Sequence, residues 1–477
     1  MTDRGHPAGT PPVPHRCRPA LVAAVLVALM VATAWPFIFA QIQRGRMALD
    51  QLHYHERTVR AFIDAWPAPD LTNYWSATTP GYHLAIAGAA KIVGDSRTML
   101  QLIASLFTVA LLGVLGWALG SRAPPLTAIA LGLPLVFSLY VWPAGVWLLP
   151  DNAGWLLVLG VLLLALRTKF GLGHLLAAGV VLAALVLVRQ IHLWAAAALW
   201  MGAWLGAGHN PDTDDPGPLD GSFKGELGWL LTPSRDRIVR TGLMVAATLP
   251  AFLIVAHFAR TWGGLTPPLF QGEFQSEEVH TGGNPAAPAF ILALIGFISL
   301  FYAGYLAAPV GHMWRTRPWV FFVAAAAGAA LALIPATTYD QGAGRWTGIW
   351  NVAAKLPSVG DQSLLILGGS MLGAIAATAW CAALKPRDRW VFIAAWAAFI
   401  AAQAASFQIW QRYSEPMVLL MMGIAATRIE LNGTPPRLIA IARIAGPSLL
   451  AALFLVLCVY QVSSSSPVDF SAVPTGP

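Results

Sequence analysis

The chain has 477 residues, of which 57% are hydrophobic and 11% charged, with a formal net charge of +7. So few charges exclude a soluble surface, and so apolar a composition excludes disorder. The widely spaced Cys17, Cys381 and Cys458 exclude a disulfide-stapled fold, and scattered Lys and Arg residues argue against nucleic acid as a partner. We therefore expect an all-α polytopic protein in the lipid bilayer.

The chain begins with a polar stretch, 1–19, predicted to be a disordered cytoplasmic tail. The run 20–40 is long enough to cross a bilayer, which takes roughly 20 residues. With it, the apolar runs predict about 13 transmembrane helices; the others lie near 98–120, 125–143, 152–167, 172–188, 190–207, 239–258, 287–306, 319–336, 362–384, 390–408, 414–427 and 438–461. Shorter stretches such as 81–93 are predicted to form short amphipathic helices at the outer surface.

Charge placement predicts the orientation. With the N-terminus inside, the inner loops carry 18 of the 29 Lys and Arg residues, as the positive-inside rule requires. The long outer loops are then 41–97, 144–151, 259–286, 337–361 and 409–413. We predict an N-terminal transmembrane module over 20–207, a cytoplasmic linker over 208–238, a C-terminal module over 239–462 and a polar tail over 463–477.

The first outer loop holds many of the polar candidates. Asp50 lies about ten residues beyond the first span, where a carboxylate could accept a proton from a sugar hydroxyl; the alternative is a solvated loop acid. His53 and His55 suggest a metal site, but HExxH fails at Val59 and plain surface histidines explain them as well. We therefore predict no metal there.

Three charged residues mark the mouths of later spans. Asp151 follows Leu149-Pro150 and could act in catalysis or cap the next helix. Arg189 interrupts an apolar stretch, and Arg412 precedes a late span. Arginine suits a phosphate through its fixed donors, and for Arg189 the alternative is snorkelling toward lipid headgroups.

Further outer residues are candidates for contact with substrate. The 20 tryptophans mostly suit an interfacial belt, although some could stack on a sugar ring. Arg345 is a third candidate for a phosphate. Candidates for substrate binding are Trp75, Thr79, Tyr82, His280, Asp340 and Trp346.

The order of these motifs resembles the C-type (GT-C) membrane glycosyltransferases. The similarity is greatest to the dolichyl-phosphoglucose-dependent α-1,2-glucosyltransferase family, which completes the N-glycan lipid precursor. That family carries Asp-Glu-x-x-His after its first span; Asp50 and His53 match the last two positions, and Leu49 replaces the first acid. Other matching stretches are Thr78–Tyr82, Pro150–Gly154, Val188–Gln190, Gly272–Glu273 with His280, Asp340–Trp346, and Arg412–Tyr413 with Pro416.

The resemblance implies a GT-C fold and a mechanism. A polyprenyl-phosphate-sugar donor would transfer glucose or another hexose, with inversion, to a glycan or lipid-linked glycan acceptor. Asp50 would be the general base, with His53 beside it, and Asp151 would orient the acceptor or hold the first loop. Arg189, Arg345 and Arg412 would bind the leaving phosphate, so no cofactor is required and a divalent metal is left open.

Two other classes of function remain open. A transporter or flippase for a lipid-linked saccharide would place its polar groups near the bilayer midplane, whereas these acids lie at one face. An inactive accessory subunit of a glycan assembly complex is the other, since one acid of the motif is missing. The Ala-, Gly- and Arg-rich composition and the short loops suggest a bacterial protein. It would then lie in the inner membrane, with the active site on the periplasmic side.

Overall fold

The computed structural model describes residues 17–206, 223–270, 282–429 and 436–468. Its regular structure is almost entirely helical, so the predicted all-α membrane class is confirmed. One antiparallel pair of two-residue strands, β1 (Ser358–Val359) and β2 (Gln362–Ser363), is the exception within these ranges. Part of the predicted linker lies outside the described residues. His280 and the two ends of the chain, 1–16 and 469–477, also lie outside them.

Five described helices are long and apolar enough to cross a membrane, or six if one sharply bent pair counts as a span. They are α1 (Cys17–Phe39), α5 (Arg97–Gly120), α12 (Arg235–Trp262), α18 (Leu364–Ala383) and α21 (Arg437–Ser464). Serine side chains begin three of them: Ser96, Ser234 and Ser363 each accept a hydrogen bond from the backbone N–H three residues later.

The other predicted apolar runs also contain helices, but shorter ones. The segments are α6 (Pro125–Val136), α7 (Val141–Val146), α8 (Asp151–Ala165), α9 (Leu172–Val188), α10 (Ala196–Trp204), α14 (Ala287–Leu300), α15 (Ala303–Thr316), α16 (Trp319–Leu333), α19 (Pro386–Ala404) and α20 (Gln411–Ala426). Two small helices, α11 (Phe223–Leu231) and α17 (Ile349–Ala353), lie outside these runs.

Three predicted runs are not single α-helices. The run 125–143 divides into α6 and α7, and the Ser138 hydroxyl accepts hydrogen bonds from the N–H groups of Tyr140 and Val141 at the break. The run 190–207 opens with a 3₁₀ helix, η2 (Gln190–Ala195). The run 287–306 bends by 103° between α14 and α15. Just after the bend, the backbone carbonyl of Gly304 accepts a hydrogen bond from Arg443 of α21. This bond fastens the start of α15 to α21.

The two predicted modules share one hydrophobic core. Helix α12 packs on α9, where Gly179 approaches the backbone of Ala247, and α21 packs on α6. Within the second half, Gly369 and Gly373 of α18 let its backbone lie against α14, as the GxxxG spacing predicts. The interleaving places both halves around the candidate site.

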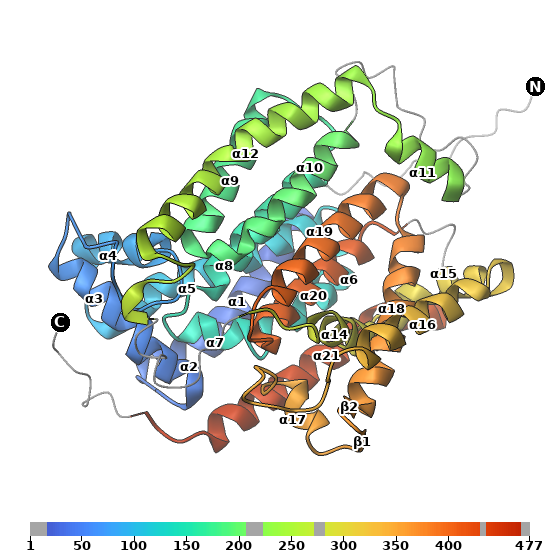
Figure 1. Cartoon of the computed structure of the whole chain (residues 1–477). Helices are drawn as coiled ribbons and strands as arrows, with labels where there is room; N and C mark the ends of the chain where they lie inside the picture. Colours follow the sequence, from blue (N-terminus) through green and yellow to red (C-terminus); the bar gives the residue numbers. More distant parts are fainter. Residues whose placement is uncertain (1–16, 207–222, 271–281, 430–435, 469–477) are drawn as a thin grey trace, which may run out of the picture.

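The two ends of the bundle have different contents. The chain between α1 and α5 forms α2 (Gly45–Asp50), a π-helical turn η1 (Gln51–Glu56), α3 (Arg57–Asp64) and α4 (Gly81–Val93), which gather at one end (Figure 1). The predicted inner loops meet at the other end through the ion pairs Arg389–Glu226 (2.6 Å) and Arg428–Asp388 (2.8 Å). Among the described residues, the first predicted outer loop therefore lies at one end, and parts of three predicted inner loops meet at the other.

Candidate active site

Four charged side chains from four separate segments meet at the predicted outer end of the bundle. The Arg412 guanidinium lies 2.6 Å from an Asp50 carboxylate oxygen and 2.6 Å from an Asp151 oxygen. Arg189 lies 2.5 Å from the other Asp151 oxygen. Two acids and two arginines balance in charge, which is how buried ions are normally tolerated. We call these four residues the ion-pair cluster.

Exposure separates the two acids of the cluster. The Asp50 side chain is 15% exposed, whereas that of Asp151 is 2% exposed. Both oxygens of Asp151 are used by arginines, and it accepts three hydrogen bonds from them. Asp50 accepts one, through Oδ2. Asp50 is therefore the carboxylate of the cluster that a substrate could reach.

Asp151 does not cap its helix. It is the first residue of α8, and the N-cap position is Pro150, which makes no side-chain cap bond. The carboxylate instead holds Arg189 and Arg412 in fixed positions. The alternative interpretation as a helix cap is therefore wrong, and the geometry indicates a positioning role.

Arg189 is placed by the chain that follows α9. Its neighbour Gln190 accepts a hydrogen bond from the N–H of Thr79 (3.1 Å) and donates to the carbonyl oxygen of Ala77 (2.7 Å). The Thr79 hydroxyl donates to the Val186 carbonyl oxygen (2.6 Å). Thr79 is thus buried in the framework. The prediction that it contacts a substrate is not supported by this position.

Arg412 is placed by the first turn of α20. Gln411 accepts a hydrogen bond from the N–H of Ile349 (2.9 Å) and donates to Glu415 (2.6 Å), whose other oxygen accepts from Ser138 (2.7 Å). This buried chain of hydrogen bonds ties α20 to the segment after α6 and to α17. It fixes the angle at which Arg412 enters the cluster.

The chain after α21 holds Asp50 in place. Residues 43–45 pair with 465–468: the N–H of Gly45 donates to Ser466 (3.2 Å) and that of Val468 to Gln43 (3.0 Å). Gly45 has φ +75°, and a Cβ there would lie 2.8 Å from the Ser465 hydroxyl oxygen. Only glycine adopts this conformation without strain, so the turn that opens α2 depends on it.

Near Arg412 and Asp151, two histidines form a buried pair that the sequence did not single out together. His55 Nδ1 and His83 Nε2 are 3.0 Å apart, and the rings stack. Burial lowers the pKa of His83 to about 3. Burial, with the charges of His83 and Arg412, lowers the pKa of His55 well below its usual value. Both rings are therefore neutral at pH 7.

A second group of side chains fixes the end of η1. The Glu56 carboxylate binds Arg97 (2.9 Å) and Arg60 (2.7 Å) and accepts a hydrogen bond from Gln51 (2.9 Å). Burial raises the pKa of Glu56, but hydrogen bonds from Arg97, Gln51 and Arg60 outweigh it and lower the pKa overall. Glu56 is a structural acid that joins η1 to α5.

Several predicted residues of the first loop form no hydrogen bond or ion pair with the cluster. His53 is exposed, and its ring contacts that of Tyr54 (centroids 6.3 Å apart). Tyr82 is fully buried and packs against His83. The Arg57 guanidinium lies over Trp75, 3.6 Å from the centroid of the indole ring. The predicted partnership of His53 with Asp50 is therefore not seen.

Arg345 does not join the other two arginines. It closes a turn with Asp340, donates to the Thr338 carbonyl oxygen (2.8 Å) and lies 3.4 Å from the exposed Asp340 carboxylate. Burial lowers the pKa of Arg345. The structure does not bring Arg345 together with Arg189 and Arg412, because its Nε bonds to Thr338 and one Nη to Asp340 beside its own turn.

Sequence reasoning missed a series of rings and cations beside the cluster. Arg46 lies over Trp346 (4.2 Å to the ring centroid), and Trp346 meets Trp410 edge to face. Trp410 stacks on Tyr413, and Tyr413 lies under Arg189 at 4.7 Å. We call Trp346, Trp410 and Tyr413 the aromatic row. Of these, only Trp346 was predicted as a substrate contact.

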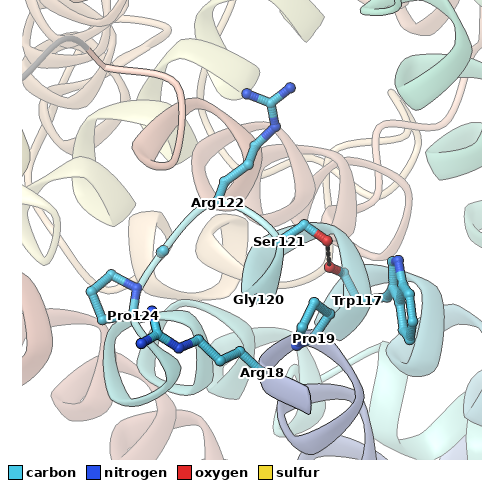
Figure 2. A pocket seen from close by; sticks show the side chains of 8 residues that line it. Arg18, Pro19, Trp117, Gly120, Ser121, Arg122 and Pro124 are labelled. Carbon is cyan, nitrogen blue, oxygen red and sulfur yellow. Dashed lines mark hydrogen bonds between the residues drawn. The ribbon is translucent and has the colours of Figure 1, made fainter. Parts of the chain in front are cut away.

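No group of three or more His, Cys, Asp or Glu side chains suited to a metal ion occurs in the described part of the chain. A surface pocket lies elsewhere, where α1 begins and α5 ends, and Figure 2 shows Arg18, Pro19, Trp117 and Gly120 around it. That is the opposite end of α1 and α5 from the ion-pair cluster. In Figure 2 Arg18 and Arg122 do not converge, so we assign this pocket no role.

Comparison with known proteins gives a match only among solved structures. No family model and no curated protein matches the sequence. One similar structure is the archaeal oligosaccharyltransferase AglB from Archaeoglobus fulgidus, in complex with an inhibitory peptide and a dolichol-phosphate (13% identity, 95% of this chain, 56% of that chain, TM-score 0.42). This chain thus spans little more than half of AglB.

Two structures of ArnT from Cupriavidus metallidurans are also similar. The one bound to undecaprenyl phosphate has 15% identity, covers 92% of this chain and 72% of that chain, and has a TM-score of 0.36. The apo structure has 14% identity, covers 89% and 78% respectively, and has a TM-score of 0.34. At these values the likeness is a loose one of helical arrangement, and the glycosyltransferase family stays a prediction.

Proposed function

We propose that this membrane protein transfers a sugar from a polyprenyl-phosphate donor to a hydroxyl group of a saccharide or lipid-linked saccharide. The observation that carries the proposal is the ion-pair cluster. It sets one accessible carboxylate, Asp50, against two arginines whose positions are fixed by the buried Asp151. A base beside fixed cations is what displacement of a phosphate requires.

The reaction balances with these groups alone. The acceptor oxygen attacks the anomeric carbon of the donor, and Asp50 takes the hydroxyl proton. The bond between that carbon and the phosphate oxygen breaks, leaving a polyprenyl phosphate monoester that Arg412 and Arg189 stabilise. Attack opposite the leaving group inverts the anomeric carbon. The transferred sugar is glucose or another hexose.

The ion pair between Arg412 and Asp50 suggests how donor binding could activate the base. In the free protein Arg412 binds Asp50 at 2.6 Å, so the carboxylate is held in an ion pair. A donor phosphate that bonds to Arg412 competes with Asp50 for the same donors. Asp50 is then released toward the acceptor, while Asp151 keeps the guanidinium in place. Donor binding would thereby activate the base.

We place the site on the periplasmic side of a bacterial inner membrane. Labelling with an impermeant thiol reagent tests this placement, in a chain whose cysteines are replaced by serine. His53→Cys is exposed beside the cluster and should be labelled in intact cells, once the reagent has access to the periplasm. Lys169→Cys, exposed at the inner end, should be labelled only after lysis. The reverse pattern would invert the orientation.

Two observations bear on the alternatives. A transporter should carry its charged groups near the midplane, whereas this cluster lies at one end of the bundle. Pairing of Asp50 with Arg412 would also suit an accessory subunit without activity. Incubating the purified chain with a panel of polyprenyl-phosphate sugars and saccharide acceptors distinguishes them. Release of polyprenyl phosphate by the wild-type chain, and not by Asp50→Asn, supports the enzyme.

A further inference from the structure

Arg46 stands on the same face of α2 as the proposed base. It lies four residues before Asp50 in one helix, a spacing that puts two Cβ atoms about 5–6 Å apart. Arg46 is exposed, and Asp50 is partly exposed. A ligand that meets the Asp50 carboxylate therefore has a guanidinium one helical turn away.

The charge of Arg46 is not neutralised by the cluster. Asp50 and Asp151 are matched by Arg412 and Arg189. Within the described ranges no carboxylate forms an ion pair with Arg46. Together, these five residues carry one positive charge in excess, next to the place where the acceptor would react.

Arg46 is held by ring faces, which leaves its hydrogen-bond donors available. Its guanidinium lies 4.2 Å from the ring centroid of Trp346 and 5.3 Å from that of Trp410. Stacking uses the flat face of a guanidinium, whereas its N–H donors point outward in the plane. Such a planar fork matches the two oxygens of a phosphate or carboxylate.

The aromatic row separates two cationic positions. Arg189 lies over Tyr413 at one end of the row, and Arg46 lies over Trp346 at the other. Arg189 shares Asp151 with Arg412, so that end belongs to the proposed donor phosphate. The Arg46 end is left for the other substrate. The indole Nε1 of Trp410 is buried without a hydrogen-bond partner, so one donor of the row is unsatisfied in the free protein.

We infer that Arg46, Trp346 and Trp410 form an acceptor subsite for an anionic saccharide, one that bears a phosphate or a carboxylate. The anionic group binds the outer edge of the Arg46 guanidinium, and the sugar ring packs on the partly exposed surface that the two indoles retain. The short span from Arg46 to Asp50 places the reacting hydroxyl on the same sugar or the next one. This inference rests on the proposed function, because Asp50 must be the base.

Binding of small probes to the detergent-purified full chain tests the subsite without catalysis. Equilibrium dialysis with glucose 6-phosphate, glucose and inorganic phosphate should show the sugar phosphate bound about tenfold more tightly than either other probe. Arg46→Ala should lose that preference over glucose, and Arg46→Lys should keep part of it. Arg57→Ala is the matched control, since it removes one stacked arginine of the same outer segment, and it should bind as the wild type does.

Defined results overturn the inference. Equal affinity of the wild type for glucose and glucose 6-phosphate removes the anion site. Inorganic phosphate bound as tightly as the sugar phosphate removes the saccharide part. Unchanged binding in Arg46→Ala moves the site elsewhere. Donor turnover by the wild type and its loss in Asp50→Asn are measured separately, so failure of the proposed function and failure of the subsite give different results.

Discussion

The Asp50 carboxylate lies 2.6 Å from the Arg412 guanidinium, although 362 positions of sequence separate the two residues. The contact joins α2, in the segment after α1, to the first turn of α20. It also brings the candidate base against the cation proposed to receive the phosphate. The first three predictions below follow from this contact and from the acid behind it.

Asp50→Asn should abolish sugar transfer while leaving the fold intact. A general base typically contributes about 10²–10⁴ in rate, so turnover should fall at least 100-fold. The measurement is consumption of a labelled polyprenyl-phosphate sugar, with the thermal midpoint as the check on folding. Asp70→Asn is the matched control, because that acid bonds only within its own exposed turn. Full transfer by Asp50→Asn would rule out the base.

Asp151→Asn should destabilise the protein more than Asp50→Asn does. The change leaves two arginines, each about a tenth exposed, without their shared carboxylate. Breaking a buried ion pair by removing one partner costs about 3–5 kcal/mol. Denaturant unfolding of both variants in the same detergent gives the comparison. Equal midpoints would mean that Asp151 does not hold the arginines.

Arg412→Ala should weaken donor binding by about 10–100-fold, the range expected for a lost hydrogen bond to a charged group. The affinity for an acceptor should change less, because Arg412 meets the leaving phosphate. Arg345→Ala provides the comparison, since its guanidinium is used by Thr338 and Asp340, and it should keep donor affinity. A larger loss in Arg345→Ala would restore the prediction made from the sequence.

The His55–His83 pair should make stability depend on pH below neutrality. An unfolded histidine has a pKa near 6.5, while burial lowers the folded pKa of His83 to about 3 and that of His55 well below its usual value. The unfolded state therefore binds more protons below pH 6.5. The stabilising contribution is full above pH 6.5 and falls as the pH drops toward 3, by up to about 1.4 kcal/mol per pH unit for each ring.

Thermal midpoints between pH 8 and pH 4 measure this dependence. His83→Gln should flatten the curve, because one proton fewer is taken up on unfolding. His257→Gln, which changes an exposed histidine of α12, should leave the curve as it is. A wild-type midpoint that stays constant from pH 7 to pH 4.5 would show that the pair does not control stability.

Gly45→Ala should lower both stability and activity. The added Cβ meets a φ of +75° and the Ser465 hydroxyl at 2.8 Å, so the turn that places α2 must shift. Gly94→Ala is the control: its φ is +106°, but no atom lies within 4 Å of the added Cβ. Both variants should lose about 1 kcal/mol or more, and only Gly45→Ala should lose transfer beyond its loss of folded protein. Equal activity of the two variants would show that the turn at Gly45 does not position Asp50.

Several residues of the candidate site could be picked out from the sequence, while others gave a misleading signal. Asp50, Arg189 and Arg412 were predicted from charge at the ends of apolar runs, and the structure brings all three together. Thr79 and Tyr82 were predicted from the stretch Thr78–Tyr82, which matches the family motif, yet both are buried in the framework. Arg46 and Trp410 carried no motif, although an arginine four residues before a candidate base was a usable signal.

The sequence by itself determined the membrane class, the helical runs and the end of the bundle at which polar residues collect. These follow from local hydrophobicity and charge, which act over the length of one helix. Only the tertiary structure decided which cation pairs with which acid. It used both oxygens of Asp151 for two arginines, kept Arg345 within its own turn and set Arg46 on the aromatic row. Such contacts depend on the packing of helices far apart in the chain, which no local pattern encodes.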